Sequence, residues 1–179
     1  MKEQIFSLRP FPANSTLPDL KITGKIAHSS NWLSISYALH GSLAEITIPV
    51  ISDKPARKDT LWEETCFELF LGLKGSDQYW ELNLSPAGYW NVYRFKTYRQ
   101  EMQEELAFLS LPFIVRNQPD ALLLDLDFGM DMIVPGEQKL EIAISAVIKL
   151  KNGKVTYWAL AHPGPKADFH RRDSFIIEL

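Results

Sequence analysis

Acidic and amide side chains recur on two neighbouring apolar runs of the sequence, where together they could bind a polar ligand. Glu68 lies in the first run, and Glu81 and Asn83 lie in the second. Carboxylate and amide groups bond paired hydroxyl groups, while flat aromatic rings pack against the C–H faces of a sugar ring. Trp62, just before the first run, could supply such a ring. These side chains together have the chemistry that a saccharide site needs.

A third run, Tyr89–Lys96, offers two alternative sets of additional binding groups. Alternate side chains of a strand point to opposite faces, so Trp90 and Arg94 share one face while Tyr93 lies on the other. If the three runs form neighbouring strands, either Arg94 or Tyr93 joins the polar groups of the first two runs. A guanidinium on that surface would form paired bonds with ligand oxygens. The pattern leaves both alternatives open.

The same polar residues also fit a structural role, or a different chemistry. Glu68, Glu81 and Asn83 could be the solvated face of an antiparallel sheet, with the aromatic residues in the core. Two carboxyl groups on adjacent strands could also form a glycosidase pair, which would require a defined separation between them. The chain contains no GxSxG nucleophile motif and no P-loop or GxGxxG phosphate-binding motif. We therefore expect no catalytic residues and no enzymatic activity.

The elements that would position these side chains are strands. Apolar and polar residues alternate in short runs separated by Gly, Pro, Asn and Asp, which is typical of an all-β protein. Only residues 98–109 are compatible with a short helix, or with a loop, before Leu111-Pro112. Eleven strands suit an antiparallel β-sandwich. The predicted strands span residues 20–28, 32–40, 43–48, 65–73, 79–85, 89–96, 113–117, 121–128, 139–146, 154–161 and 174–179.

Length and composition predict one globular domain over residues 1–179. The chain is 46% apolar and 23% charged, with a formal net charge of −3. This charge provides no basic excess for nucleic acid, so we expect no nucleic-acid partner. No apolar run approaches about twenty residues, which argues against a membrane span. The first fifteen residues lack the apolar core of a signal peptide, so we expect a cytoplasmic protein. The sequence does not indicate an oligomeric state.

No metal or cofactor site is evident from residue spacing. The single cysteine, Cys66, cannot form an intramolecular disulfide and lies in an apolar run typical of a buried, inert thiol. The four histidines lack the close spacing of a zinc site. Met130 or Met132 with a distant histidine could ligate haem iron, although methionine more often fills a core. We therefore expect no metal and no cofactor.

Three segments resemble a known family. Residues 58–71 read KDTLWEETCFELFL, and residues 79–88 read YWELNLSPAG. A Trp before a strand with E-x-F, a tyrosine-led strand with E-x-N, a Pro-x-Gly turn and an aromatic strand follow one another. This order resembles a DOMON-like domain related to family 9 carbohydrate-binding modules. Residues 168–175, DFHRRDSF, are similar to the closing segment of that family. The direct match covers about a third of the chain.

The resemblance implies a jelly-roll-like sandwich that binds sugars, or haem in some branches, through one sheet face and its loops. By motif position it points to Trp62, Glu68, Glu81, Asn83 and Arg94, with Trp90, Trp158 or Tyr93 as a second aromatic ring. We therefore expect a non-catalytic module that recognises a saccharide or a sugar-containing metabolite. The alternative is a protein-interaction module that docks a partner through an aromatic sheet face. Haem binding is a third possibility.

Overall fold

The computed structural model describes residues 2–12, 17–134, 136 and 138–179, and these residues form an antiparallel β-sandwich. The predicted all-β sandwich is therefore confirmed. The described residues contain three 3-10 turns and no α-helix; the turns are η1 (Leu43–Glu45), η2 (Leu61–Glu63) and η3 (Arg172–Ser174). The strands are β1 (Lys2–Pro10), β2 (Leu20–Ser29), β3 (Trp32–Gly41), β4 (Cys66–Leu73), β5 (Tyr79–Leu84), β6 (Trp90–Phe95), β7 (Gln103–Glu104), β8 (Phe113–Asn117), β9 (Ala121–Gly129), β10 (Leu140–Lys149), β11 (Val155–Ala159) and β12 (Ile177–Glu178).

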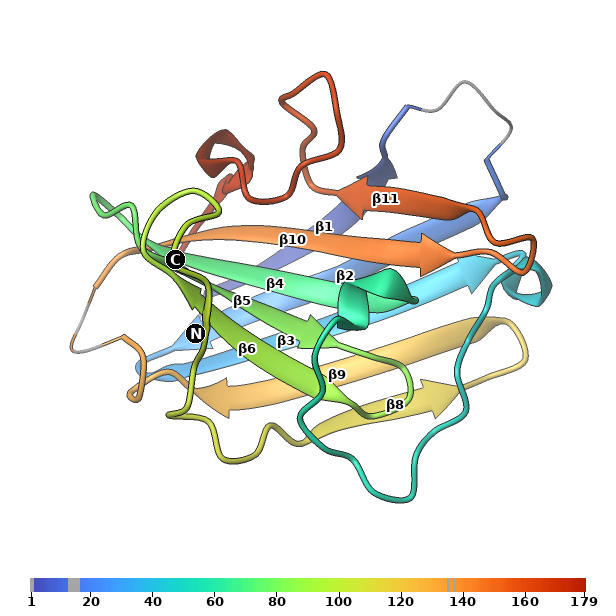
Figure 1. The fold of residues 1–179 in the computed structure, drawn as a ribbon, viewed down its shortest axis with the longest axis horizontal. Helices are drawn as coiled ribbons and strands as arrows, with labels where there is room; N and C mark the ends of the chain where they lie inside the picture. The colour runs from blue at the N-terminus through green and yellow to red at the C-terminus, as the bar shows by residue number, and fades with distance from the viewer. Residues whose placement is uncertain (1, 13–16, 135, 137) are drawn as a thin grey trace.

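The strands are arranged in two layers, which Figure 1 shows one in front of the other. The rear sheet has the order β1-β2-β3-β9-β8, and the front sheet has the order β7-β6-β5-β4-β10-β11. Every strand pair in both sheets is antiparallel. The short strand β12 pairs with β10 near the end of the chain. Strands β4, β5 and β6 are neighbours, which is the condition under which the polar residues of the three runs share a sheet surface.

Strand β1 joins the two sheets. Its residues 2–8 pair with β2 of the rear sheet, and Arg9 and Pro10 then pair with Ala159 and Trp158 of β11 in the front sheet. The pattern of apolar and polar residues did not predict this strand. Phe6 and Leu8 are buried with the expected period of two, but the exposed Ile5 beside Phe6 interrupts the apolar alternation.

The main core lies between the sheets and uses the inner face of each strand. On β4 this face carries Phe67, Leu69 and Leu71, all fully buried in the largest apolar cluster. A smaller cluster lies on the outer face of the front sheet and includes Phe70, Tyr79, Tyr93, Phe95, Ala143 and Phe175. The C-terminal segment covers this cluster, since Phe169 and Phe175 come from residues 160–179. The outer face is therefore partly buried, not simply solvated.

Three predicted elements differ from the structure. The predicted strand at 43–48 is wrong: Leu43–Glu45 form η1, and only Ile46 makes an isolated bridge, to Leu150. The predicted strand at 174–179 is reduced to Ile177–Glu178. Residues 98–109 form turns and the two-residue strand β7. Of the two alternatives for that segment, the loop is correct.

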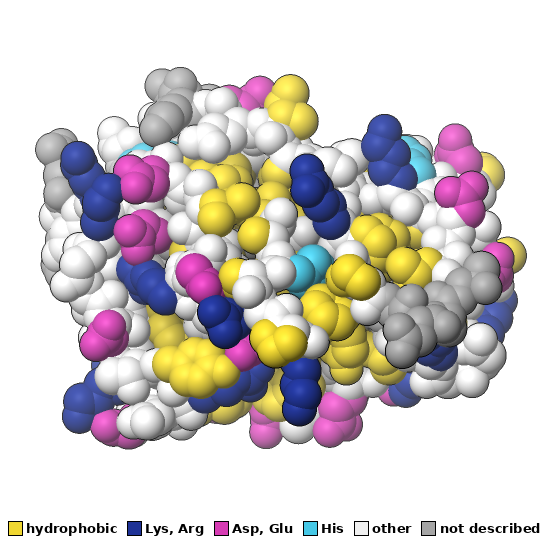
Figure 2. Space-filling view, turned by 90° about the horizontal axis from the view of Figure 1, so that it is seen from above, with side chains coloured by type: hydrophobic (Ala, Val, Ile, Leu, Met, Phe, Trp, Pro, Cys, Tyr) yellow, Lys and Arg dark blue, Asp and Glu magenta, His cyan; other side chains and the backbone are white. Residues whose placement is uncertain are grey.

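The surface mixes charged groups of both signs. Figure 2 shows acidic and basic side chains interspersed with apolar ones over the face seen from above. Among the described residues, no helix is long and apolar enough to cross a membrane.

Candidate ligand-binding site

The floor of the candidate site is the outer face of the front sheet. Across β4 and its two neighbours, Glu68 lies opposite Asn83 on one side and Ser145 on the other. Glu81 lies opposite Phe70, so it is one diagonal step from Glu68 on the same face. The sequence predicted this shared face from the period of two. Glu68 and Glu81 are only 2% and 5% exposed, because loops rise around them.

These loops enclose a pocket of about 320 Å³. Its sheet residues are Glu68, Glu81, Phe95, Val147 and Tyr157. Trp62, Arg99 and Met102 come from the loops around the sheet, and Ala167, Asp168, Phe169 and His170 come from the C-terminal segment. The lining thus combines aromatic rings with carboxyl, guanidinium and imidazole groups.

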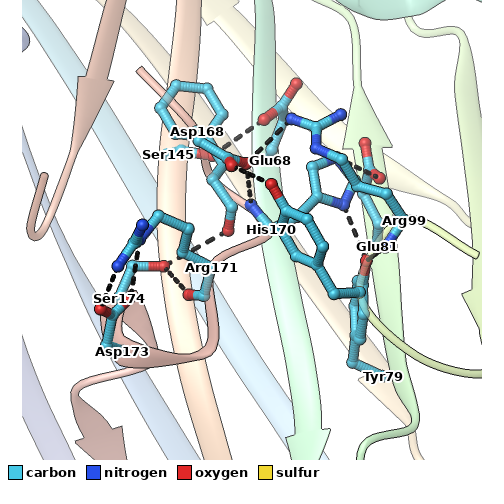
Figure 3. A network of polar contacts seen from close by, with 12 residues as sticks. Glu68, Tyr79, Glu81, Arg99, Ser145, Asp168, His170, Arg171, Asp173 and Ser174 are labelled. Carbon is cyan, nitrogen blue, oxygen red and sulfur yellow. Dashed lines mark hydrogen bonds and ion pairs between the residues drawn. The ribbon is translucent and has the colours of Figure 1, made fainter. Parts of the chain in front are cut away.

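Asp168 ties two of the walls together, as Figure 3 shows. One carboxylate oxygen accepts hydrogen bonds from Arg99 Nη2 at 2.9 Å and from the backbone N–H of His170 at 3.2 Å. The other oxygen accepts a hydrogen bond from Tyr98 Oη at 2.5 Å. Burial acts to raise the pKa of Asp168, but the bonds from Tyr98 and Arg99 outweigh it and lower this pKa below its usual value. Asp168 therefore stays ionised and holds the 97–102 turn against the C-terminal segment.

His170 is held in a neutral state above the floor. The Nδ1 atom of His170 lies within hydrogen-bond distance of Tyr79 Oη, at 2.9 Å. The same hydroxyl oxygen accepts a hydrogen bond from the backbone N–H of Arg99 at 3.1 Å. Burial, and then the nearby Arg99 charge, lower the pKa of His170 to about 4. Its Nε2 lies 3.7 Å from a Glu81 oxygen. Because the imidazole is uncharged near neutral pH, the contact between His170 and Glu81 is not an ion pair at that pH.

The two floor carboxyl groups each have one neutral hydrogen-bond donor. Ser145 Oγ donates to Glu68 Oε2, and Asn83 Nδ2 donates to Glu81 Oε1, both at 2.9 Å. Burial, together with repulsion from Glu81, raises the pKa of Glu68 to about 8. Burial likewise raises the pKa of Glu81 to about 7, although Asn83 and Arg99 oppose that shift. Near neutral pH the pair therefore retains protons that exposed glutamates would have lost.

The structure brings together some of the predicted site residues. Trp62, Glu68 and Glu81 line the pocket. Asn83 is fully buried beside them and acts on Glu81 through its side-chain amide. Trp62 packs edge-to-face on Tyr93, with ring centroids 5.7 Å apart. Tyr93 thus holds the Trp62 ring from the same sheet face.

Trp90 and Arg94 do not line this pocket. Both lie on the inner side of β6. Trp90 belongs to the main core, and the guanidinium carbon of Arg57 lies 4.5 Å from the centroid of its ring. Arg94 lies at the end of that face, is exposed, and donates a hydrogen bond to Gln103 Oε1 at 3.0 Å. Of the two alternatives for the third run, Tyr93 is therefore the residue that shares a face with Glu68 and Glu81.

The residues that form the walls were not predicted from the sequence. Arg99 and Met102 lie in a turn without periodicity, and Tyr157 lies on a strand without a distinctive motif. Asp168 and His170 lie in the DFHRRDSF segment, which resembled the family's closing segment but received no role. The pairing of Asp168 with Arg99 joins positions 69 residues apart, and no local pattern reveals it. Among the described residues, no group of three or more His, Cys, Asp or Glu side chains could hold a metal ion.

Comparison with known proteins shows similarity of fold. No protein-family model matches the chain, and no curated protein sequence matches it. A candidate carbohydrate-binding protein from Bacteroides uniformis superposes with a TM-score of 0.71 at 12% identity, over 96% of this chain and 83% of the other. A family 9 carbohydrate-binding module from Caldicellulosiruptor kristjanssonii, solved with glucose, superposes with a TM-score of 0.53 at 12% identity. That match covers 92% of this chain and 78% of the module.

Proposed function

We propose that this protein is a non-catalytic module that binds a saccharide in the pocket above β4 and β5. The observation that carries the proposal is the lining itself, in which aromatic rings surround two buried carboxyl groups. The similar fold of a module solved with glucose supports it, as does that of a candidate carbohydrate-binding protein. The motifs at 58–71 and 79–88 support a relationship to DOMON-like domains within this group of folds.

The Trp62 ring and the floor of the pocket have different parts in this binding. The half-buried ring of Trp62, held in place by Tyr93, would stack against the C–H face of a sugar ring. Glu68 and Glu81 would bond its hydroxyl groups from below. The volume of about 320 Å³ is near the lower end of the usual range for small-molecule pockets. It therefore suits one sugar unit better than a long chain.

The placement of the carboxyl groups favours binding over hydrolysis. Glycosidases use two carboxyl groups that flank the scissile bond. Glu68 and Glu81 instead project from adjacent strands on one sheet face, and both form the floor of the pocket. A bound sugar would have both groups on the same side.

Calorimetric titration with monosaccharides and disaccharides tests the proposal, using Trp62→Ala and a matched Trp32→Ala variant. Trp32 is an exposed tryptophan on β3 of the rear sheet and does not line the pocket. We expect saturable binding by the native protein, a loss of at least about tenfold in affinity for Trp62→Ala, and no change for Trp32→Ala.

Two outcomes would contradict the proposal. One is that no saccharide binds, or raises the melting temperature, at concentrations near millimolar. The other is that Trp62→Ala binds as tightly as the native protein while remaining folded. Asn83→Ala adds a second check: because it removes the donor that positions Glu81, we expect weaker binding here as well.

A further inference from the structure

The pocket contains more carboxyl groups than basic groups. Glu68, Glu81 and Asp168 contribute three carboxyl groups, whereas Arg99 is the one Lys or Arg side chain among the described lining residues. Arg99 is already bonded to Asp168. His170 is buried and uncharged near neutral pH. Glu68 and Glu81 are therefore left without a cationic partner of their own.

The hydrogen bonding of these two groups is also incomplete. Within the described part of the chain, the Glu68 carboxyl accepts a hydrogen bond only from Ser145, and the Glu81 carboxyl only from Asn83. One oxygen of each group remains without a donor within hydrogen-bond distance, and both side chains are more than nine-tenths buried and line the pocket. A buried carboxylate without a partner is costly. Retained protons reduce this cost near neutral pH, and a cationic group on a ligand would reduce it instead.

The aromatic walls suit a positively charged ligand as well as a sugar ring. Trp62, Tyr157 and Phe169 border the same space as the two carboxyl groups. Ring faces attract cations, most strongly where water is excluded. A primary ammonium group has three donors and no acceptor, which complements the two free carboxyl oxygens. A carboxylate on the ligand would instead lie beside the two acidic groups Glu68 and Glu81.

We propose that the pocket prefers a saccharide that carries a primary ammonium group, such as a hexosamine, over its neutral parent sugar and over a uronic acid. The ammonium group binds between Glu68 and Glu81, and the sugar ring packs on Trp62. This inference rests on the proposed saccharide binding and names the class of sugar that the same site takes.

Calorimetric titration of the native protein at pH 6.5, where a sugar amine is protonated, tests this preference. The ligands are glucosamine, glucose, N-acetylglucosamine and glucuronic acid. N-acetylglucosamine is the matched control, because it keeps the nitrogen substituent and loses the charge. We expect glucosamine to bind at least about tenfold more tightly than glucose or N-acetylglucosamine, and glucuronic acid to bind most weakly.

A Glu68→Gln variant assigns the preference to the floor of the pocket. The amide keeps the shape of the side chain and removes its charge, so we expect the ratio of glucosamine to glucose affinity to fall to within about threefold. Glu81→Gln is the companion variant, and the comparison of ligands on the native protein stands even if a variant folds poorly. An unchanged ratio in both folded variants would overturn the assignment.

The outcomes separate this inference from the proposed function. If glucose binds and glucosamine binds no more tightly, the preference for an ammonium group is wrong and saccharide binding stands. If none of the four sugars binds, both proposals fail. If glucuronic acid binds best, Arg99 governs the charge selectivity and the inference is overturned.

Discussion

Glu68 and Glu81 share one feature that sets them apart from the acids on the surface. Each is buried on a sheet face and, among the residues that the structure describes, has a single neutral donor, Ser145 or Asn83, and no cation of its own. Their protonation is therefore linked to folding, because the folded protein holds protons that the unfolded chain releases. The site then adds a pH dependence to the stability of the whole protein.

We predict that the free energy of unfolding falls between pH 6.5 and pH 8. In this window the buried Glu68, with its pKa raised from 4.5 to about 8, binds more protons in the folded protein than in the unfolded chain. Stability therefore decreases as pH rises, by roughly 1–3 kcal/mol at about 1.4 kcal/mol per pKa unit. Below pH 6.5, His170 has the opposite effect on stability. Its pKa is lowered to about 4 in the folded protein, so the unfolded chain binds this proton more readily and the contribution of His170 to stability rises with pH.

Urea denaturation at pH 6.5 and pH 8 measures this change. Glu68→Gln should show a smaller decrease than the native protein. Glu63→Gln, at an exposed acid outside the pocket, is the matched control and should behave as the native protein does. Equal decreases in Glu68→Gln and the native protein would rule out Glu68 as the source.

At single residues, the sequence predicted the floor of the pocket better than its walls. Glu68 and Glu81 were found because a period of two, with neighbouring strands, places them on one face. The same period left Arg94 and Tyr93 as alternatives, since it does not say which face of β6 turns inward. Arg99 and Asp168 could not be found, because turns bring them together without any local pattern.

At the scale of elements, the C-terminal segment makes the outer face of the front sheet into a pocket. Arg172 crosses the sheet surface directly over Gly72, where Nε and Nη2 donate hydrogen bonds to one Glu141 oxygen at 2.9 and 2.6 Å. Nη2 also donates to the carbonyl oxygen of Leu73 at 2.6 Å. The guanidinium lies 5.0 Å from the ring centroid of Phe175, which packs on the outer cluster. These contacts anchor the segment that carries Asp168 and His170.

We predict that Gly72→Ala loosens this segment. A Cβ at Gly72 would lie 2.1 Å from Arg172 Nη1, so the guanidinium must leave its place beside Glu141. Gly129→Ala is the matched control in β9, where an added Cβ meets nothing within 4 Å. We expect a loss of about 1–2 kcal/mol for Gly72→Ala, with faster amide hydrogen exchange in residues 169–178. Unchanged exchange there would show that Arg172 does not hold the segment.

The strands were predicted well where apolar and polar residues alternate. Strands β2, β3 and β4 agree with the predicted ranges to within one residue at each end. The prediction failed at 43–48, where alternating residues form η1 and then extended chain with one isolated bridge. It also failed at β1, because Ile5 is exposed beside the buried Phe6. In both places the structure depends on whether a neighbouring strand is available for pairing, and the local alternation of residues does not show this.

For the whole molecule, the two faces of the front sheet have separate tasks. The inner face belongs to the main core, and the outer face carries the pocket. Both faces of β4 and β5 are covered, so these two strands are buried almost throughout. Substitutions in the main core can therefore lower stability while the pocket on the outer face stays intact.

We predict that Leu124→Ala lowers stability without changing the affinity for sugar. Leu124 is fully buried in the main core, on β9 of the rear sheet. Removing its side chain should cost about 2–5 kcal/mol, since a cavity remains. Chemical denaturation measures the loss, and titration well below the melting temperature measures the affinity. A loss of affinity as large as that of Trp62→Ala would show that the main core and the pocket are coupled.

The passage of β1 from one sheet to the other bears on how the protein folds. Arg9 pairs with Ala159, a contact between positions about 150 residues apart in the chain. Loop closure over such a distance is entropically costly, whereas the β2–β3 hairpin closes over only two residues. We expect hairpins to form first and the joint at β1 to close late. A chain emerging from the ribosome would leave the end of β1 unpaired until β11 had been synthesised.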